Sequence, residues 1–332
     1  MMDKAVSLPK ILVTRKIPET GLKLLRLSCE VDLYEDDNPI PRELLIKKVK
    51  HLDGLLCLLS ETVDDELLTS APALKVVSNY AVGYDNIDVA AATRHKVVVT
   101  NTPGVLTDAT ADLAWALLLA SARRLVESDR IMRQETYSGW APLYMLGADI
   151  KGKTLGILGA GRIGAAIVKR SMGWQMRVLY FDHQKNASLE NEFSAEKVDL
   201  DYLIKESDFI SIHLPLTDKT HHLLNKESFQ KMKKTAILIN TARGPIIDEA
   251  ALVVALKNKW IAGAGLDVYE NEPQIASGLK DLENVTLAPH IGSATVHSRN
   301  EMARIAAQNL LSVLEGKKPE FVVNPEVYNK GR

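Results

Sequence analysis

Three polar residues in the second half of the chain, an arginine, a glutamate and a histidine, could together bind and protonate a small acid. They lie in the segments NTARG, DVYENEP and APHIG and are Arg243, Glu272 and His290. A guanidinium can hold a carboxylate through two hydrogen bonds, and a carboxylate beside an imidazole orients the ring and stabilises its protonated form. The three residues therefore predict acid–base chemistry on a carboxylate-bearing substrate. The alternatives are a capping or surface arginine and a loop histidine with a structural hydrogen bond.

A glycine-rich loop supplies a second candidate site. It comprises Gly159, Ala160, Gly161, Arg162, Ile163 and Gly164. A strand pattern precedes the loop, and a helical pattern that should bury Ile163, Ile167 and Val168 follows it to Met172. In this context the first glycine permits a tight turn, the second lets the backbone approach a pyrophosphate, and the third lets helix and strand pack closely. The loop predicts dinucleotide binding; a glycine-rich turn without a ligand is the alternative.

The residue after the next predicted strand indicates which dinucleotide binds. Asp182 follows the strand pattern at 178–181, and an acidic side chain there can accept hydrogen bonds from ribose hydroxyls. Its charge would repel a 2′-phosphate, which favours NAD over NADP. His183 and Lys185 could offset part of that repulsion, so NADP is the second choice. A turn residue at a strand end is the alternative for Asp182.

A second match to a phosphate-binding pattern lies just upstream, between Gly147 and Thr154. These residues fit GxxxxGK[ST]. That pattern binds phosphate only where a strand feeds the loop and the Lys-Thr pair opens a helix. Here Lys153 and Thr154 open a predicted strand instead. We therefore interpret the match as a surface turn and do not expect an NTPase.

Short β-branched runs alternate with amphipathic stretches, and these elements must position the candidate residues. Such alternation indicates βαβ units and parallel sheets. The predicted strands of a first series lie at 11–14, 54–59, 75–78 and 97–100, and those of a second at 154–158, 178–181, 209–213, 236–240, 263–267 and 285–288. Arg243, Glu272 and His290 all follow strands of the second series, at the edge where open α/β sheets bind ligands.

The remaining segments indicate where the two domains divide. The pattern predicts a turn at 101–104, a long helix from Thr107 to about Arg133, an irregular arm at 139–147 and a helix at 295–314. Residues 321–325 have no new strand–helix unit to join and are expected to return to the first series. The predicted domains are therefore 1–103 with 294–332, and 104–293.

Size and charge limit the class of protein. The chain has 332 residues, 46% of them hydrophobic and 25% charged, with 41 basic and 42 acidic side chains. This length exceeds the roughly 250–300 residues that one core supports, so two domains are expected. The balanced charge argues against nucleic acid or an anionic membrane as a partner. The longest apolar run, 113–122, falls short of the ~20 residues that span a bilayer.

The cysteines and the N-terminus indicate a reducing, cytoplasmic location. Cys29 and Cys57 have neither CxxC nor metal-ligand spacing, so both are expected to be buried thiols and no metal site is predicted. Of the other histidines, His213 is expected to line the cofactor site, and His221 and His222 to face solvent. The first ten residues show no apolar core of a signal peptide.

From about Asn79 to Gly292 the chain resembles the D-isomer-specific 2-hydroxyacid dehydrogenases. The segments LGAGRIG, NTARG and PHIG occur in the family's order. Two further segments, NYAVGYDNID and TNTPGVLTD, most resemble the glyoxylate and hydroxypyruvate reductases of that family. The resemblance implies an α/β protein of two doubly wound parallel-sheet domains, in which a Rossmann cofactor domain is inserted into a flavodoxin-like substrate-binding domain and the active site lies in the cleft.

The resemblance also implies roles for the catalytic residues. The backbone N–H groups of Val82 and Gly83 would hold the substrate carboxylate. Arg243 would hold the carboxylate and oxo group and polarise the carbonyl. His290 would protonate the carbonyl oxygen, and Glu272 would stabilise the histidinium. Because the donor must be protonated, reduction should weaken as the pH rises.

Further contacts follow from the same resemblance. The positions expected around the cofactor, beyond the glycine loop with Asp182 and His183, are Thr241, Ala242, Arg243, Asp267 and Gly292. Trp140 matches an aromatic residue that the partner subunit of a homodimer supplies to the substrate site; an ordinary interface aromatic is the alternative.

The activity implied is NAD(P)H-dependent reduction of a small 2-oxo acid, glyoxylate or hydroxypyruvate. One departure concerns the cofactor. NADPH-using relatives carry Ser, Asn or Gly followed by Arg where this chain has Asp182 and His183, so NAD(H) is favoured over NADP(H). The alternatives are a D-lactate or D-3-phosphoglycerate dehydrogenase and, in another class, an NAD-sensing binding protein of the corepressor type.

Overall fold

The computed structural model describes residues 7–329, which fold as two compact units. The first unit comprises the described residues up to Leu106 and those from Ala294 onward, and the second comprises Thr107–Ser293. No helix within the described residues has the length and apolar character needed to cross a bilayer.

The first unit is built on a five-stranded parallel sheet. Its strands, in spatial order, are β2 (Glu30–Leu33), β1 (Lys10–Val13), β3 (Gly54–Cys57), β4 (Val76–Asn79) and β5 (Val98–Thr100). This 2-1-3-4-5 order is that of flavodoxin-like sheets, as predicted. The four strands predicted for this unit are present. The edge strand β2 was not predicted, since charged residues interrupt its apolar residues and no residue in it is fully buried.

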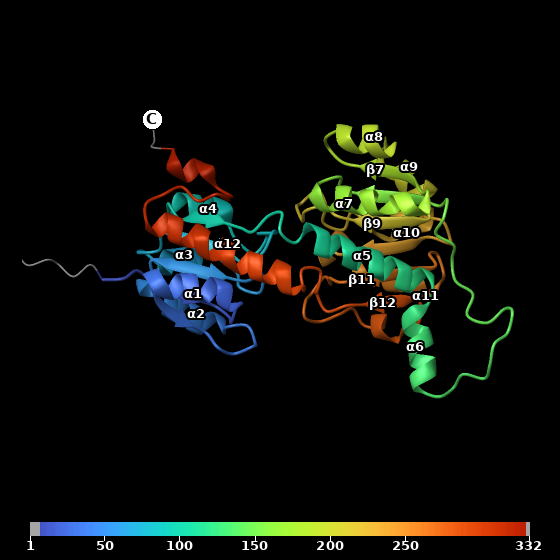
Figure 1. Cartoon of the computed structure of the whole chain (residues 1–332), viewed down its shortest axis with the longest axis horizontal. Helices are drawn as coiled ribbons and strands as arrows, with labels where there is room; N and C mark the ends of the chain where they lie inside the picture. Colours follow the sequence, from blue (N-terminus) through green and yellow to red (C-terminus); the bar gives the residue numbers. More distant parts are fainter. Residues whose placement is uncertain (1–6, 330–332) are drawn as a thin grey trace, which may run out of the picture. The chain divides into compact units, whose positions relative to one another are not determined.

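Helices cover both faces of this sheet. They are α1 (Glu19–Ser28), α2 (Arg42–Lys48), α3 (Asp65–Ser70), α4 (Val89–Arg94) and α12 (Val296–Leu314), with short 3-10 turns at Val49–His51 and Pro325–Tyr328. One core joins α2, α3 and α4 to the sheet. On the other face α1 lies along α12 (Figure 1), so close that a Cβ on Gly21 would come within 2.6 Å of the carbonyl oxygen of Ala303.

The segment after α12 returns to the first sheet, as predicted. Val322 forms an antiparallel bridge with Thr100, and the N–H of Val323 donates to the carbonyl of Val99 at 2.8 Å. Asn324, which is fully buried, accepts the N–H of Val99 through its side-chain oxygen at 2.8 Å. These contacts tie the last described residues to the edge strand β5.

The second unit is built on a seven-stranded parallel sheet. Its strands, in spatial order, are β12 (Val285–Leu287), β11 (Gly263–Leu266), β10 (Ile237–Asn240), β9 (Phe209–Ile212), β6 (Thr154–Leu158), β7 (Arg177–Phe181) and β8 (Glu196–Lys197). The strand order reverses between β6 and β9, which is the Rossmann arrangement, as predicted. The six predicted strands of this unit are present, and only the two-residue β8 was missed.

Helices also cover both faces of the second sheet (Figure 1). They are α5 (Thr107–Ala122), α6 (Leu125–Arg133), α7 (Arg162–Ser171), α8 (Ala187–Phe193), α9 (Leu200–Glu206), α10 (Lys226–Lys231) and α11 (Glu249–Lys257), with 3-10 turns at Met172–Trp174, Gly244–Ile246 and Leu279–Asp281. One core joins α5, α7 and α8 to the sheet, and another joins α9, α10 and α11 to it. Thr154 opens strand β6, so the upstream GxxxxGK[ST] match does not open a helix.

Two local predictions were wrong. The long helix expected from Thr107 ends at Ala122, because Arg124 adopts a left-handed conformation with φ of 51° that breaks the helix before α6. In α7, Ile167 and Val168 are buried as predicted, but Ile163 is only half-buried, since it lies in the first turn above the glycine loop.

Candidate active site and cofactor loop

His290 and Glu272 form a hydrogen-bonded pair in the second unit. The ring Nδ1 of His290 lies 2.8 Å from Oε2 of Glu272, and Oε1 of Glu272 accepts the backbone N–H of Tyr269 at 3.0 Å. Both side chains remain about one-third exposed, at 35% and 36%. The carboxylate binds Nδ1 and so fixes the orientation of the ring. The other ring nitrogen, Nε2, is therefore the atom that can pass a proton to a ligand.

The charge of Glu272 is stabilised in this arrangement. Burial by itself would raise the pKa of Glu272, but the hydrogen bond and positive charge of His290, the N–H of Tyr269 and the charge of Arg243 outweigh it and lower that pKa. Glu272 therefore stays ionised beside the imidazole of His290.

A buried carboxylate holds the loop that carries His290. Both oxygens of Asp267 accept backbone N–H groups at 2.7 Å, one from Ile291 and one from Gly292, and the Asp267 carbonyl accepts the N–H of His290 at 2.9 Å. Burial raises the pKa of Asp267. Its backbone partners fix a loop in which His290 adopts a φ of 54°, a left-handed conformation that is uncommon outside glycine. The structure thus gives Asp267 a positioning contact that the sequence did not reveal.

Arg243 follows β10 in a loop closed by its own hydrogen bonds. Asn240 donates its side-chain N–H to the carbonyl of Arg243 at 2.9 Å and accepts the N–H of Ala242 at 3.0 Å, while a guanidinium nitrogen of Arg243 donates to the carbonyl of Ala242 at 2.8 Å. A Cβ on Gly244 would collide with the backbone of Tyr269, so this loop packs directly on the Glu272 loop. The packing of Gly244 on Tyr269 places the Arg243 loop beside the loop of Glu272, and the charge of Arg243 contributes to the lowered pKa of Glu272.

The glycine loop has the geometry of a dinucleotide site. Gly159 has a φ of 97°, and a Cβ there would lie 2.7 Å from the backbone of His213. A Cβ on Gly161 would meet nothing within 4 Å, which leaves open space above the first turn of α7. A Cβ on Gly164 would collide with the carbonyl of Gly159, so only glycine lets α7 pack on the loop. The N–H groups at the start of α7 form the part of the loop that suits an anion.

Two further observations fit the loop to a nucleotide cofactor. The carboxylate of Asp182 lies at the loop, where it accepts the N–H of Ala160 at 2.8 Å, and Asn186 donates to the carbonyl of Ala160 at 2.8 Å. Near the acid–base loops, the hydroxyl oxygen of Thr241 is buried and has no hydrogen-bond partner within residues 7–329. A polar ligand would satisfy this hydroxyl. His183, the other residue expected at the ribose, is exposed.

The remaining histidines of this unit differ from one another. His213 follows β9 with Nε2 2.8 Å from the hydroxyl of Ser211, and burial lowers the pKa of His213 to about 3, so it stays neutral. His221 is exposed, as predicted. The expectation that His222 faces solvent was wrong, because its Nε2 lies 2.7 Å from Oε1 of Glu270 and the ring is only partly exposed.

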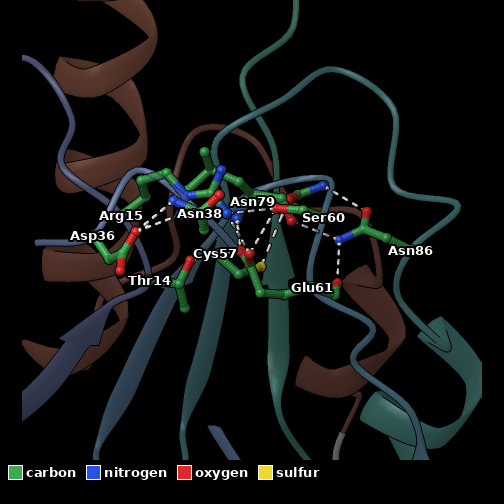
Figure 2. A network of polar contacts seen from close by, with 10 residues as sticks. Thr14, Arg15, Asp36, Asn38, Cys57, Ser60, Glu61, Asn79 and Asn86 are labelled. Carbon is green, nitrogen blue, oxygen red and sulfur yellow. Dashed lines mark hydrogen bonds and ion pairs between the residues drawn. The ribbon is translucent and has the colours of Figure 1, made fainter. Parts of the chain in front are cut away.

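In the first unit, neutral side chains arrange the loop after β4. Asn101 donates to the carbonyl of Val82 at 2.7 Å, and Asn79 donates to the carbonyl of Gly83 at 2.8 Å. Asn79 also donates to Oδ1 of Asn86 at 3.1 Å (Figure 2). Within the described residues, neither N–H of the Val82–Gly83 pair donates a hydrogen bond. The loop thus has its carbonyls engaged and two adjacent N–H donors available, which suits a carboxylate.

Beside this loop, Glu61 is the centre of a polar network (Figure 2). It is 3% exposed and accepts the hydroxyls of Thr14 and Ser60, both at 2.6 Å, and the N–H of Leu58 at 2.7 Å. The guanidinium of Arg15 lies 3.4 Å from its Oε1. These contacts compensate the buried charge and fix the ends of β1 and β3.

Comparison with known proteins decides the family. The family model described as D-isomer specific 2-hydroxyacid dehydrogenase, NAD binding domain, matches residues 115–292. A glyoxylate reductase of Thermococcus onnurineus is 52% identical over 325 residues, which cover 97% of each chain. The chain belongs to the D-isomer-specific 2-hydroxyacid dehydrogenase family.

Solved structures agree with this assignment. The TT0316 protein of Thermus thermophilus superposes with a TM-score of 0.89 at 42% identity and covers 95% of this chain and 99% of its own. An NADPH-dependent glyoxylate/hydroxypyruvate reductase of Sinorhizobium meliloti, in complex with NADP and malonate, superposes with a TM-score of 0.85 at 33% identity, covering 96% of this chain and 98% of its own.

Sequence reasoning missed several residues that organise this dehydrogenase's loops. Asn79, Asn101 and Asn240 lie inside segments quoted for the resemblance, yet no role was assigned to them. Their position at the ends of strand patterns was the available signal, because amides at strand ends can hydrogen-bond neighbouring loop backbone. The pairing of Glu61 with Arg15 could not be predicted in this way, since it depends on two strands that are adjacent only in the folded sheet.

The arm between α6 and β6 is irregular, as predicted, and runs as a long open loop (Figure 1). Trp140 is 82% exposed and Leu143 is 83% exposed. Helix α6 has no buried residue, although it contains Leu125 and Met132, which are both 60% exposed. Together they form a run of exposed apolar side chains on the second unit.

Proposed function

We propose that this dehydrogenase reduces small 2-oxo acids, glyoxylate and hydroxypyruvate, to 2-hydroxy acids of D configuration where C2 is chiral, with NADH as the preferred cofactor. The observation that carries the proposal is the 2.8 Å pair between His290 and Glu272, with the charge of Arg243 acting on the same carboxylate. This arrangement supplies a proton donor beside a carboxylate-binding cation. The curated relatives at about half identity are named glyoxylate reductases, which supports this choice of substrate.

The residues of this chain would act in the following order. The N–H groups of Val82 and Gly83 bind the substrate carboxylate, and Arg243 binds the carboxylate and the oxo group and polarises the carbonyl. The cofactor, when bound, supplies a hydride to C2. His290 passes the proton on Nε2 to the carbonyl oxygen, and Glu272 stabilises the imidazolium before that transfer.

The second unit would hold the cofactor. We place the pyrophosphate at the loop of Gly159, Ala160, Gly161, Arg162, Ile163 and Gly164, where the first turn of α7 presents its N–H groups. Asp182 would accept the ribose hydroxyls and disfavour a 2′-phosphate, with His183 beside it. Around the nicotinamide we place Thr241, Ala242, Arg243, Asp267 and Gly292. The buried hydroxyl of Thr241 supports this placement.

We further propose a cytoplasmic homodimer in which the second unit binds cofactor and the first binds substrate. The exposed apolar side chains of α6 and the arm, with Trp140 among them, support an interface between two copies. Cys29 and Cys57 are both buried free thiols, as predicted, and free thiols fit a reducing compartment. The oligomeric state is measured by light scattering, and a Trp140→Ala variant tests whether the arm affects KM.

The decisive test is an assay of NADH and NADPH oxidation with glyoxylate, hydroxypyruvate, pyruvate and 3-phosphohydroxypyruvate. We expect turnover with the first two, slower turnover with pyruvate, and higher kcat/KM with NADH than with NADPH. Fastest turnover with pyruvate or with the phosphorylated substrate would favour D-lactate or D-3-phosphoglycerate dehydrogenase. Absence of turnover with every pair would contradict the enzyme and leave an NAD-sensing binding protein.

A further inference from the structure

A cluster of metal-ligating side chains lies in the second unit and includes none of the proposed catalytic residues. It consists of His221 and His222, which lie in the turn between β9 and α10, and Glu270, which lies in the loop after β11. One ligand atom of each of the three lies within 4.8 Å of the other two. The two imidazole rings are stacked with centroids 4.0 Å apart, and His222 Nε2 is 2.7 Å from Glu270 Oε1.

The backbone holds His222 in place before any ligand arrives. Its φ is 50°, which lies in the left-handed region, and its N–H donates to the carbonyl of Pro245 at 2.8 Å. Two residues later the N–H of Leu224 donates to the carbonyl of Ile246 at 3.1 Å. This short ladder against a neighbouring segment fixes the turn, so the histidine rings need little further ordering to bind a ligand.

Glu270 is held equally firmly. Its Oε2 accepts the N–H of Glu249 at 3.2 Å, and its own N–H donates to Oε2 of Glu249 at 3.2 Å. This reciprocal pair leaves Oε1 of Glu270 directed at His222. The carboxylate thus has one oxygen for the protein backbone and one for the histidines.

The local charge favours a cation. Glu249 is 4% exposed, and its Oε1 has no hydrogen-bond partner within the described residues. Within residues 7–329, the ion pair of Glu270 is with His222, and no arginine or lysine forms an ion pair with Glu249 or Glu270, so the charge of Glu270 stays available to a cation.

We propose that His221, His222 and Glu270 bind a divalent transition-metal ion of the Zn²⁺ type. Two imidazole nitrogens and one carboxylate oxygen are a ligand set that Zn²⁺ and its neighbours accept, with water in the remaining position. Metal–ligand bonds of roughly 2.0–2.2 Å place tetrahedral ligand atoms about 3.4 Å apart. The ligand atoms of the cluster lie between 2.7 Å and at most 4.8 Å apart, a range that includes this value. Rotation of the exposed His221 ring would bring the three atoms to the spacing that the ion requires.

The site would link two loops of the second unit. Glu270 lies two residues before Glu272, so a bound ion would join the β9–α10 turn to the loop that carries the partner of His290. Metal binding would replace the hydrogen bond between His222 and Glu270. Binding of the ion to the folded protein therefore stabilises it against unfolding, and this binding can be measured without any substrate.

The test is calorimetric titration of chelator-treated protein with Zn²⁺, repeated with Co²⁺ so that its absorption spectrum reports the ligands. The variants are His221→Ala, His222→Ala and Glu270→Gln, with His290→Ala added to report binding at the acid–base pair. The matched control is His95→Ala, because His95 also contacts a carboxylate, Asp65, at 3.1 Å but belongs to no group of three metal-ligating side chains within the described residues. Circular dichroism checks that each variant is folded.

We expect one Zn²⁺ per chain in the unmodified protein and in His95→Ala. Each of the three cluster variants should lose at least about tenfold in affinity, which is the loss caused by disturbing even an outer-shell partner of a metal site. His221→Ala is the most informative variant, since its exposed side chain forms no hydrogen bond within the described residues whose loss would unfold the protein. Unchanged affinity in His221→Ala and His222→Ala would overturn the proposal. Loss of binding only in His290→Ala would also overturn it, because that result would place the ion at the acid–base pair.

Discussion

The loop that carries His290 in the second unit and the loop after β4 in the first unit are held by different chemical groups. Carboxylates hold the first: Asp267 accepts N–H groups of the His290 loop, and Glu272 binds the ring. The carboxylate of Asp182 likewise accepts an N–H of the glycine loop. In the first unit the amides of Asn79 and Asn101 hold the carbonyls of the loop after β4. A carboxylate stabilises a protonated imidazole and accepts hydrogen bonds from ribose hydroxyls. A neutral amide that binds loop carbonyls leaves the loop N–H groups available and does not repel an anion bound there. The difference matches the groups that we propose each loop binds.

The largest expected effect is a loss of turnover on removal of His290, the side chain whose loop and ring the carboxylates hold. His290→Ala should lower kcat with glyoxylate and NADH by on the order of 10²–10⁴-fold, the usual contribution of a general acid. NADH affinity, measured by fluorescence titration, should change little. His297→Ala, which removes an exposed histidine from α12, is the control and should keep full turnover. A His290→Ala variant with near-normal kcat would show that the carboxylate-held loop does not supply the proton.

A second prediction concerns the carboxylate at the glycine loop. Asp182→Ser should reduce the preference for NADH over NADPH by roughly 10–100-fold, because hydrogen bonds to a charged group contribute about 1.5–3 kcal/mol. The measurement is kcat/KM for both cofactors at fixed glyoxylate. Asp218→Ser, a substitution at an exposed turn residue of the same unit, should leave the ratio unchanged. An unaltered ratio in Asp182→Ser would mean that this carboxylate does not discriminate the cofactors.

A third prediction replaces an amide of the first unit by a carboxylate of the kind that holds the His290 loop. Asn101→Asp should raise KM for glyoxylate by about tenfold or more, since a new negative charge beside the Val82 carbonyl would repel the substrate carboxylate. Asn101→Ala loses only a neutral hydrogen bond of about 0.5–1.5 kcal/mol and should raise KM by roughly two- to tenfold. Asn38→Ala is the control, because within the described residues Asn38 donates its hydrogen bonds to Asp36 in an exposed loop. Equal KM values for the two Asn101 variants would show that charge is irrelevant at this loop.

The smallest expected effect is on stability at acid pH. The pKa of Glu272 is lowered below its ordinary value of 4.5, so the carboxylate's contribution is fully present above that value and is lost as the pH falls through the folded pKa. The Tm difference between the natural protein and Glu272→Gln should therefore shrink between neutral pH and pH values below about 4. The difference should be small at any pH because Glu272 is 36% exposed. A difference that grows on acidification would contradict this sign.

Sequence reasoning reached the elements that carry local signals. The strands before Arg243 and His290 were predicted because parallel strands show as short β-branched runs, and the glycine loop because each glycine has a backbone requirement that spacing reveals. The pairing of Glu272 with His290 was inferred from chemistry, and the structure shows it at 2.8 Å.

The parts that were not predicted depend on contacts between segments far apart in the chain. The bond from the N–H of Gly292 to Asp267 joins residues 25 positions apart, and Glu61 meets Thr14 across 47 positions. The break at Arg124 is a single change of backbone conformation inside a continuous helical pattern. The approach of His222 to Glu270 requires two loops to be adjacent, which neither loop specifies by itself.

The divided first unit has a consequence for the order of folding during synthesis. Thr107–Ser293 is a continuous segment, so the second unit has its whole sheet as soon as β12 has been made. The first unit must wait for α12, whose Ala306 carbonyl accepts the hydroxyl of the buried Ser78 at 2.9 Å, and then for Asn324. Until those residues leave the ribosome, one face of its sheet lacks its longest helix. The nascent chain therefore passes through a stage in which a finished Rossmann unit is joined to an incomplete neighbour with exposed apolar surface.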